Sequence, residues 1–189
     1  MSKLFAVTGQ NNRRNAGKRA VDTEILLRVV QSKDRGSINY MQAVARMNFF
    51  HLGYRKAGKI LDEDLLHTLG DGIVESFRIV DDNEWRKLTN AEKCAIGIFH
   101  KNLGDDMEIP YTPLPSCEGG WENGLHFAQE LKDWTIQYEK AVAKPVATND
   151  QYVRVYVDSA TSAMPKAVTT FLRKKLGSEL DDTMRMSLK

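Results

Sequence analysis

All five prolines in this chain of 189 residues lie between Pro110 and Pro165. Proline breaks a helix because it lacks a backbone N–H and because its ring clashes with the preceding turn. The first hundred residues can therefore form long helices, and apolar residues there recur at helical spacing. Because strand signals are scarce, the sequence predicts an all-α fold in which residues 1–189 form a single globular domain of seven to eight helices.

Capping signals and apolar spacing place four helices before the first proline. The second contains Met41–Tyr54, which is apolar or aromatic on nearly every side, so this helix is expected to be central and surrounded by packing. In the third, Gly70 and Gly72 indicate close packing or a kink. The expected boundaries are Arg19–Gln31, Ser37–Gly58, Asp62 to about Val74, and a helix opened by a Thr89–Glu92 capping box and ended at Gly104.

The rest of the chain is expected to hold a long loop and further helices. Ile109–Gly120 contains three prolines and a glycine pair, which predicts a loop of functional length. A helix should then run from about Glu122 to Val142, and residues 1–18 should form a mobile N-terminal arm. The C-terminal helices are expected within 143–189, with a Thr148–Gln151 capping box, a first turn at Pro165, an end at Gly177 and a short last helix capped by Ser178.

Composition excludes several classes of function. The 27 basic and 25 acidic residues leave a net charge of +2, too small for a protein that binds nucleic acid through its overall field. A basic cluster is interpreted as a solvated arm. Two cysteines, Cys94 and Cys117, are too few for a disulfide framework and too far apart for a C-x-x-C metal site. No run approaches the roughly 20 apolar residues of a membrane span. The members of the basic cluster are Arg13, Arg14, Lys18 and Arg19.

His51 is the histidine with the most unusual surroundings among the four in the chain. It lies between Phe50 and Leu52 in the most apolar predicted helix, and Arg55 follows one turn later on the same face. A neutral imidazole on a buried helix can be an axial ligand of haem iron, and an arginine one turn away can pair with a propionate. Because no C-x-x-C-H motif is present, such a haem would be b-type rather than covalently attached. A packed or surface histidine is the simpler interpretation.

Two further groups share helix faces. Arg19 is followed at i+3 and i+4 by Asp22 and Thr23, where a charge pair and a hydroxyl could meet a ligand, although a surface ion pair at a helix start explains them equally well. Thr68 and Glu75 are seven residues apart and are predicted to point inward beside the apolar stripe. A buried Glu75 would have to be paired or protonated.

Six blocks of sequence resemble the fungal ER-bound oxygenases of the mycophenolic acid type, in that family's order. They cover most of the chain from Leu4 to about Asn149, with weaker similarity onward. The blocks are RAVDTEIL from Arg19, AVARMNFFHLGYRKAGKI from Ala43, DEDLLHTL from Asp62, EWRKLTNAEKCAIGIF from Glu84, LGDDMEIPY from Leu103 and GWENGLHFAQELKDW from Gly120.

A more distant resemblance links the chain to bacterial rubber oxygenases, through the pairs Arg19–Thr23 and His51–Arg55. The resemblance implies a helical domain around a b-type haem pocket, with His51 as iron ligand. It also implies oxidative cleavage of a carbon–carbon double bond in an isoprenoid or other hydrophobic secondary metabolite, with dioxygen. The other residues expected around the pocket are Arg19, Asp22, Thr23, Arg46, Arg55 and Thr68, and Met41, Met47, Phe49 and Phe50 could line a substrate channel or pack in the core.

The chain differs from these families at three points. Asp22 stands where rubber oxygenases carry a lysine able to approach the iron, and His100 stands where fungal relatives usually carry tryptophan. His100 is thus either a neutral variation or a rival ligand. Relatives also carry an N-terminal membrane anchor, whereas here Met1 begins directly within the similar region, so this chain is expected to be cytoplasmic or peripheral to the ER membrane. Of the other histidines, His126 is expected to be structural and His67 to be a surface residue. Asp64 and His67 have a D-x-x-H spacing that only weakly resembles helical metal-binding motifs.

Two alternatives stay open at the level of sequence. The acidic clusters Asp81–Glu84 and Asp105–Glu108 could bind magnesium and a prenyl diphosphate, although such clusters are common on solvated helix ends. The chain could also be a non-catalytic helical scaffold descended from the oxygenases. The presence of all four family residues argues against such a decayed site: Arg19, Thr23, His51 and Arg55.

Overall fold

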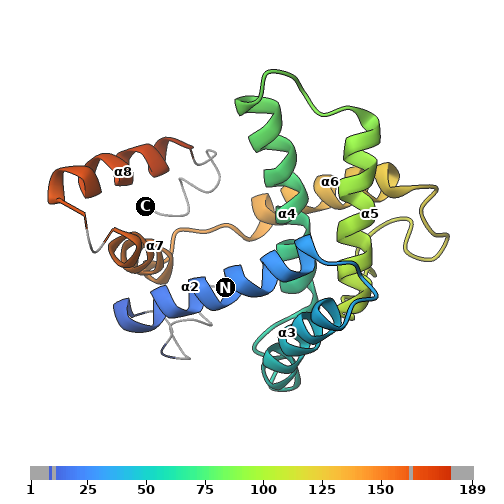
Figure 1. Cartoon of the computed structure of the whole chain (residues 1–189), viewed down its shortest axis with the longest axis horizontal. Coiled ribbons are helices and arrows are strands. Elements are labelled where there is room, and N and C mark those ends of the chain that lie inside the picture. The colour runs from blue at the N-terminus through green and yellow to red at the C-terminus, as the bar shows by residue number, and fades with distance from the viewer. Residues whose placement is uncertain (1–8, 10–11, 162–163, 180–189) are drawn as a thin grey trace. The chain divides into compact units, whose positions relative to one another are not determined.

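A computed structural model describes Gly9, residues 12–161 and residues 164–179. Within these ranges the structure has seven α-helices and no strand, which confirms the all-α prediction (Figure 1). None of these helices is both long enough and apolar enough to cross a membrane. The helices are α2 (Arg13–Ser32), α3 (Ile38–Lys56), α4 (Asp62–Asn83), α5 (Asn90–Asp106), α6 (Gly124–Val142), α7 (Ala147–Ala160) and α8 (Lys166–Glu179).

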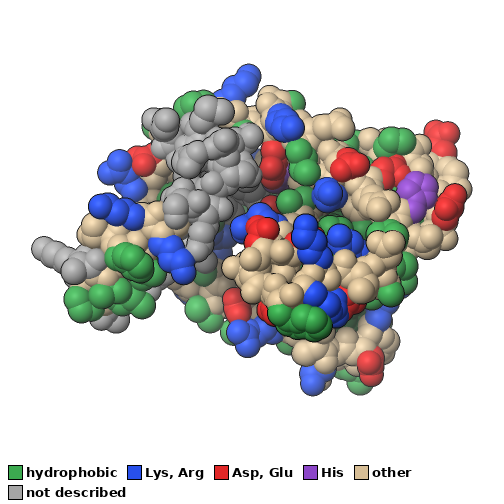
Figure 2. Space-filling model, turned by 90° about the horizontal axis from the view of Figure 1, so that it is seen from above, with side chains coloured by type: hydrophobic (Ala, Val, Ile, Leu, Met, Phe, Trp, Pro, Cys, Tyr) green, Lys and Arg blue, Asp and Glu red, His purple; other side chains and the backbone are tan. Residues whose placement is uncertain are grey.

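The chain divides into two compact units. One comprises the described residues of Met1–Ala43 and Val142–Lys189, and the other comprises Val44–Ala141. Each unit is described by itself below. Acidic and basic side chains are intermixed with apolar ones on the face seen in Figure 2, as expected for a chain with a net charge of +2.

The first unit is built on the contact of α2 with α7. A Cβ atom added to Gly17 would lie 2.6 Å from Oγ of Ser159, so the two helices approach closely there. Helix α2 begins at Arg13 because the Asn12 side chain accepts a hydrogen bond from the Asn15 backbone N–H at 3.0 Å. Residues 13–18, expected in a mobile arm, are therefore helical, and the rest of that predicted arm lies mainly outside the described residues.

The second unit has its core among α4, α5 and α6. Leu66, Ile73, Phe127 and Leu131 are almost completely inaccessible to solvent. Small residues allow the helices to approach one another. A Cβ atom on Gly97 of α5 would lie 1.9 Å from the carbonyl oxygen of Gly124, where α6 begins.

The glycines of α4 also allow neighbouring helices to approach closely. A Cβ atom on Gly70 would lie 1.9 Å from Oγ1 of Thr135 on α6, and one on Gly72 would lie 2.8 Å from Nε2 of His100 on α5. The close packing predicted for these two glycines is confirmed. Because the contacts are made on two different neighbours, α4 is held between α5 and α6.

Several predicted helix ends are wrong, for reasons that are clear in the structure. Gly104 does not end a helix: it lies within α5, where a Cβ atom would be 2.3 Å from Oη of Tyr111 and 2.7 Å from Cδ2 of Leu69. α4 begins at Asp62, with Leu61 in the cap position, but it continues past the predicted end near Val74 to Asn83, and the Asp64 carboxylate accepts the Leu61 backbone N–H. The helix opened by Thr89 and Glu92 and the loop over 109–120 are confirmed.

The C-terminal helices are confirmed with shifted boundaries. The segment rich in valine and tyrosine after Ala147 is helical, but Thr148 lies inside α7 and Val146 occupies the cap position. Pro165 precedes α8 directly, and its carbonyl accepts the backbone N–H groups of Val168 and Thr169. The helix continues past Gly177 to Glu179 and so includes Ser178, and the short last helix expected after Ser178 falls in residues 180–189, outside the described ranges.

Helix α3 differs most from expectation. It ends as predicted before Gly58, which has a φ of 62°, but it is not surrounded by packing. Its buried side carries Tyr40, Ala43, Val44 and Met47. The candidate channel residues therefore separate, with Met47 buried and the others on the surface. The exposed apolar residues of α3 are Ile38, Met41, Phe49, Phe50, Leu52 and Tyr54.

We expect Gly97→Ala to destabilise the second unit by at least about 1 to 3 kcal/mol, because the new methyl group would meet a backbone carbonyl that cannot rotate away. Gly53→Ala is the matched control. Gly53 also lies within a helix, but nothing lies within 4 Å of an added Cβ atom, so this change should stabilise the chain by about 0.5 to 1 kcal/mol. Urea unfolding followed by circular dichroism measures both. Equal effects would contradict the close approach of α5 and α6.

The capping box of α5 should make stability depend on pH. The pKa of Glu92 is held well below its usual range, first by hydrogen bonds from Arg86, at 2.8 Å, and then by the backbone and hydroxyl of Thr89. A carboxylate whose folded pKa is depressed stabilises the fold above its unfolded pKa of about 4.3, and loses this effect as the pH falls further. Glu92→Gln should therefore lower the urea midpoint at pH 7, and the difference from the unsubstituted chain should shrink steadily below about pH 4. A constant difference would refute this role.

Candidate functional site

His51 is half-buried on α3, in the second unit. Burial lowers the pKa of its imidazole, and the positive charge of Arg55 lowers it further. The ring is therefore neutral near neutral pH and carries a lone pair on one nitrogen. This is the protonation state in which histidine ligates a metal. The chemistry of the donor fits an axial haem ligand.

The side of α3 that carries His51 is fixed to the end of α5. Nδ2 of Asn48 donates to the carbonyl oxygen of Asp106 at 2.9 Å, and Nη2 of Arg55 donates to the carbonyl oxygen of Glu108 at 3.2 Å. These side chains lie three residues before and four residues after His51, so all three share a helix face. Arg55 also donates to Oδ1 of Asp62 at 2.9 Å, at the start of α4. We name Asn48, Arg55 and the carbonyls of Asp106 and Glu108 the α3 anchor.

The two arginines predicted around His51 differ in position. Arg55 shares its face, and its guanidinium has five N–H donors, only some of which serve Asp62 and Glu108. Arg46 is exposed, with its guanidinium 5.4 Å from the ring centre of Phe50. It is five residues from His51, or about 140° around the helix, so α3 does not present them together.

The group Arg19, Asp22 and Thr23 lies in the first unit. Arg19 donates to the hydroxyl of Tyr152 on α7 at 3.0 Å, and its guanidinium carbon is 5.8 Å from the centre of that ring. Asp22 pairs with Lys18, one turn earlier, and Thr23 is exposed. Whether this group meets His51 stays a prediction, since they belong to different units.

Thr68 and Glu75 do not point inward as predicted. Thr68 is exposed, and its hydroxyl donates to the carbonyl of Asp64 within its own helix. Glu75 forms a two-pronged ion pair with Arg78 at 2.6 and 3.0 Å, and its side chain is 42% exposed. The inward face of α4 is instead made of the apolar residues Leu65, Leu66, Leu69, Ile73 and Phe77.

His100, the rival ligand, is packed between helices. Its Nδ1 donates to the carbonyl oxygen of Ile96 at 2.8 Å, which leaves the lone pair on Nε2. That nitrogen faces Gly72 on α4, where even a methyl group would approach within 2.8 Å. Burial lowers the pKa of this imidazole as well. Because backbone covers the lone pair, the geometry favours the neutral variation over a ligand.

The other two histidines have structural partners. His67, expected on the surface, is half-buried and bridges α4 to α6 through Glu139 at 2.9 Å. His126 lies 3.4 Å from the Ser116 hydroxyl and 3.4 Å from Glu130, but both contacts use Nε2. Its Nδ1 accepts the Glu122 backbone N–H. In a serine–histidine–acid catalytic triad the serine and the carboxylate bind opposite nitrogens of the imidazole, so these three residues do not form one. The structural role expected of His126 is supported.

The acidic clusters are already engaged. Asp81 accepts the Leu88 backbone N–H at 2.8 Å and lies 3.6 Å from Lys93, while both oxygens of Asp105 bind Lys101. Among the described residues, no group of three metal-binding side chains is close enough to hold an ion. The magnesium and prenyl diphosphate alternative therefore has no support from the geometry.

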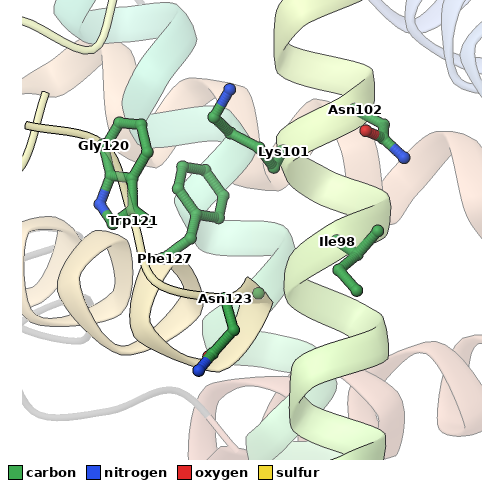
Figure 3. A pocket seen from close by; sticks show the side chains of 8 residues that line it. Ile98, Lys101, Asn102, Gly120, Trp121, Asn123 and Phe127 are labelled. Atoms are coloured by element: carbon green, nitrogen blue, oxygen red, sulfur yellow. The ribbon is translucent and has the colours of Figure 1, made fainter.

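A pocket of about 400 Å³ opens where α5, α6 and the preceding loop meet (Figure 3). Nζ of Lys101 lies 5.4 Å from the ring of Trp121, which packs edge-on against Phe127. This pocket could not be predicted from the sequence, because its walls come from two stretches of chain that are well separated in sequence. His51 does not line it. The lining residues are Ile98, Lys101, Asn102, Gly120, Trp121, Asn123, Gly124 and Phe127.

Three curated proteins are similar to this chain. ER-bound oxygenase mpaB of Penicillium roqueforti (strain FM164) is 34% identical over 193 aligned positions, which cover all of this chain and 63% of that protein. ER-bound oxygenase mpaB' of Penicillium brevicompactum is 34% identical over all of this chain and 45% of its own length. ER-bound oxygenase mpaB of the same species is 36% identical over 87% of this chain and 41% of its own length.

No family model matches the chain, and no solved structure matches it. The chain spans between about two fifths and just under two thirds of the length of these relatives. The similarity nevertheless extends over all of this sequence, and so over all seven described helices. The chain is therefore similar, over its whole length, to the mpaB-type ER-bound oxygenases.

Proposed function

We propose that this chain is part of a haem-dependent oxygenase in which His51 is the axial ligand of a b-type haem. The observation that carries the proposal is a neutral, half-buried imidazole on a helix face fixed by the α3 anchor. The names of the relatives support oxygenase chemistry. When bound, the haem would supply the activation of dioxygen, while the protein sets the axial ligand and the polarity of the pocket.

Different residues would ligate the haem, position the helix and bind a propionate. His51 supplies the lone pair, and the anchor limits the movement of its helix. Arg55 would offer its remaining donors to a propionate while it keeps its bonds to Asp62 and Glu108. Arg19, Asp22 and Thr23 are proposed to act on the substrate, since an arginine and a hydroxyl can orient a polar atom.

The proposed substrate is a hydrophobic secondary metabolite with a carbon–carbon double bond, such as an isoprenoid chain, which dioxygen would cleave or oxidise. A protein of this kind would act in the cytoplasm or at the surface of the ER, where such substrates partition. The direct test is uptake of dioxygen by the haemin-loaded protein with a prenylated substrate, followed by mass spectrometry of carbonyl products.

The ligand assignment is tested by His51→Ala. The purified chain should bind haemin with a Soret band and a b-type pyridine haemochrome spectrum, and His51→Ala should lose most of the bound haem while the helix content persists. The matched controls are His100→Ala and His126→Ala. His100 has its lone pair covered and His126 has structural partners, so both should keep the cofactor.

Two outcomes would refute the proposal. Haem content that is unchanged in His51→Ala but lost in His100→Ala would move the ligand to α5. A chain that folds but binds no haemin would favour the non-catalytic scaffold.

A further inference from the structure

Helix α3 carries an exposed apolar strip on the side opposite its buried residues. Phe49 is 74% exposed and Leu52 is 49% exposed, whereas Val44 and Met47 on the other side are buried. Ala45, four residues before Phe49, is also exposed. Residues spaced by three and four lie on one face of a helix, so these three side chains form a continuous strip.

The charges on this helix are all of one sign. α3 contains Arg46, Arg55 and Lys56 and no aspartate or glutamate, in a chain whose net charge is only +2. Arg55 is engaged by Asp62, but Arg46 and Lys56 are exposed beside the apolar strip, and the exposed Lys59 follows the helix. We name Ala45, Arg46, Phe49, Leu52 and Lys56 the α3 surface.

We propose that the α3 surface binds the headgroup region of an anionic lipid bilayer, with Phe49 and Leu52 entering the acyl boundary and Arg46 and Lys56 contacting phosphate. An exposed phenylalanine and leucine flanked by cations, with no anions on the helix, is the pattern of a helix that lies in a membrane interface. This inference goes beyond the proposed function and does not depend on haem.

The charge pattern selects a lipid surface over a second copy of the chain. Two α3 surfaces facing each other would bring arginine and lysine against arginine and lysine with no carboxylate from either helix. Like charges at such an interface oppose association. An anionic bilayer supplies both the apolar volume and the negative charge that the surface lacks.

The test is flotation of the full chain with vesicles. The chain should float with phosphatidylcholine vesicles that contain phosphatidylserine, float much less with pure phosphatidylcholine, and lose binding at about 1 M salt, where charges are screened within a few ångströms. Leu52→Glu and Phe49→Glu should each reduce partitioning about tenfold or more, since an apolar side chain no longer leaves water. Arg46→Glu combined with Lys56→Glu should abolish the preference for phosphatidylserine.

Ile79→Glu is the matched control. Ile79 lies on α4 and is 49% exposed, the same fraction as Leu52, so it should leave binding unchanged. Equal loss in Ile79→Glu and Leu52→Glu, or no flotation of the unsubstituted chain, would overturn the proposal. So would a dimer in analytical ultracentrifugation that Leu52→Glu dissociates, since a second copy would then cover the surface.

A measurement on the unsubstituted chain protects the test against misfolded variants. Anionic vesicles should slow hydrogen exchange in peptides from residues 44–56 and leave peptides from α6 unchanged. Uniform slowing, or none in residues 44–56, would contradict the assignment of the surface.

Discussion

The α3 anchor is the interaction on which the proposed site depends. Asn48 and Arg55 bind the backbone carbonyls of Asp106 and Glu108, one on each side of His51 along the helix. Glu108 adopts a φ of 55°, an uncommon conformation for a residue other than glycine, so the chain turns sharply where Arg55 holds it. Because Arg55 also binds Asp62, one guanidinium ties α3 to the end of α5 and to the start of α4.

This arrangement gives α3 two different sides. One side carries the anchor and a half-buried, neutral imidazole, and the other carries Phe49 and Leu52 in solvent. The apolar character of the whole helix, which suggested complete burial, would follow from the proposed arrangement, in which α3 contacts the protein on one side and a bilayer on the other. A site for an apolar substrate would then lie on the helix that contacts the lipid phase.

Most helices could be predicted from the sequence, but which helix faces are buried and which distant residues are in contact could not. The Thr89–Glu92 box and the close packing of Gly70 and Gly72 depend on local spacing or on small volume, so they could be predicted from residue type. Gly104 was predicted wrongly as a helix end, because the sequence does not distinguish a glycine that ends a helix from one that lets a side chain, here Tyr111, pack against the helix backbone. The seven-residue spacing of Thr68 and Glu75 puts both residues on one face of the helix, but it does not show whether another helix covers that face. The inward orientation was therefore predicted wrongly. The bond of Asn48 to Asp106, 58 residues away, has no signal in one sequence.

Ligation of haem by His51 can be tested by filling the cavity of a glycine variant with free imidazole. His51→Gly removes the ring but leaves the anchor residues Asn48 and Arg55 in place. We expect this variant to bind haemin weakly alone and to regain the Soret spectrum of the unsubstituted chain when imidazole is added, whereas His126→Gly should keep that spectrum without imidazole. Normal haemin binding by His51→Gly without imidazole would contradict ligation by His51.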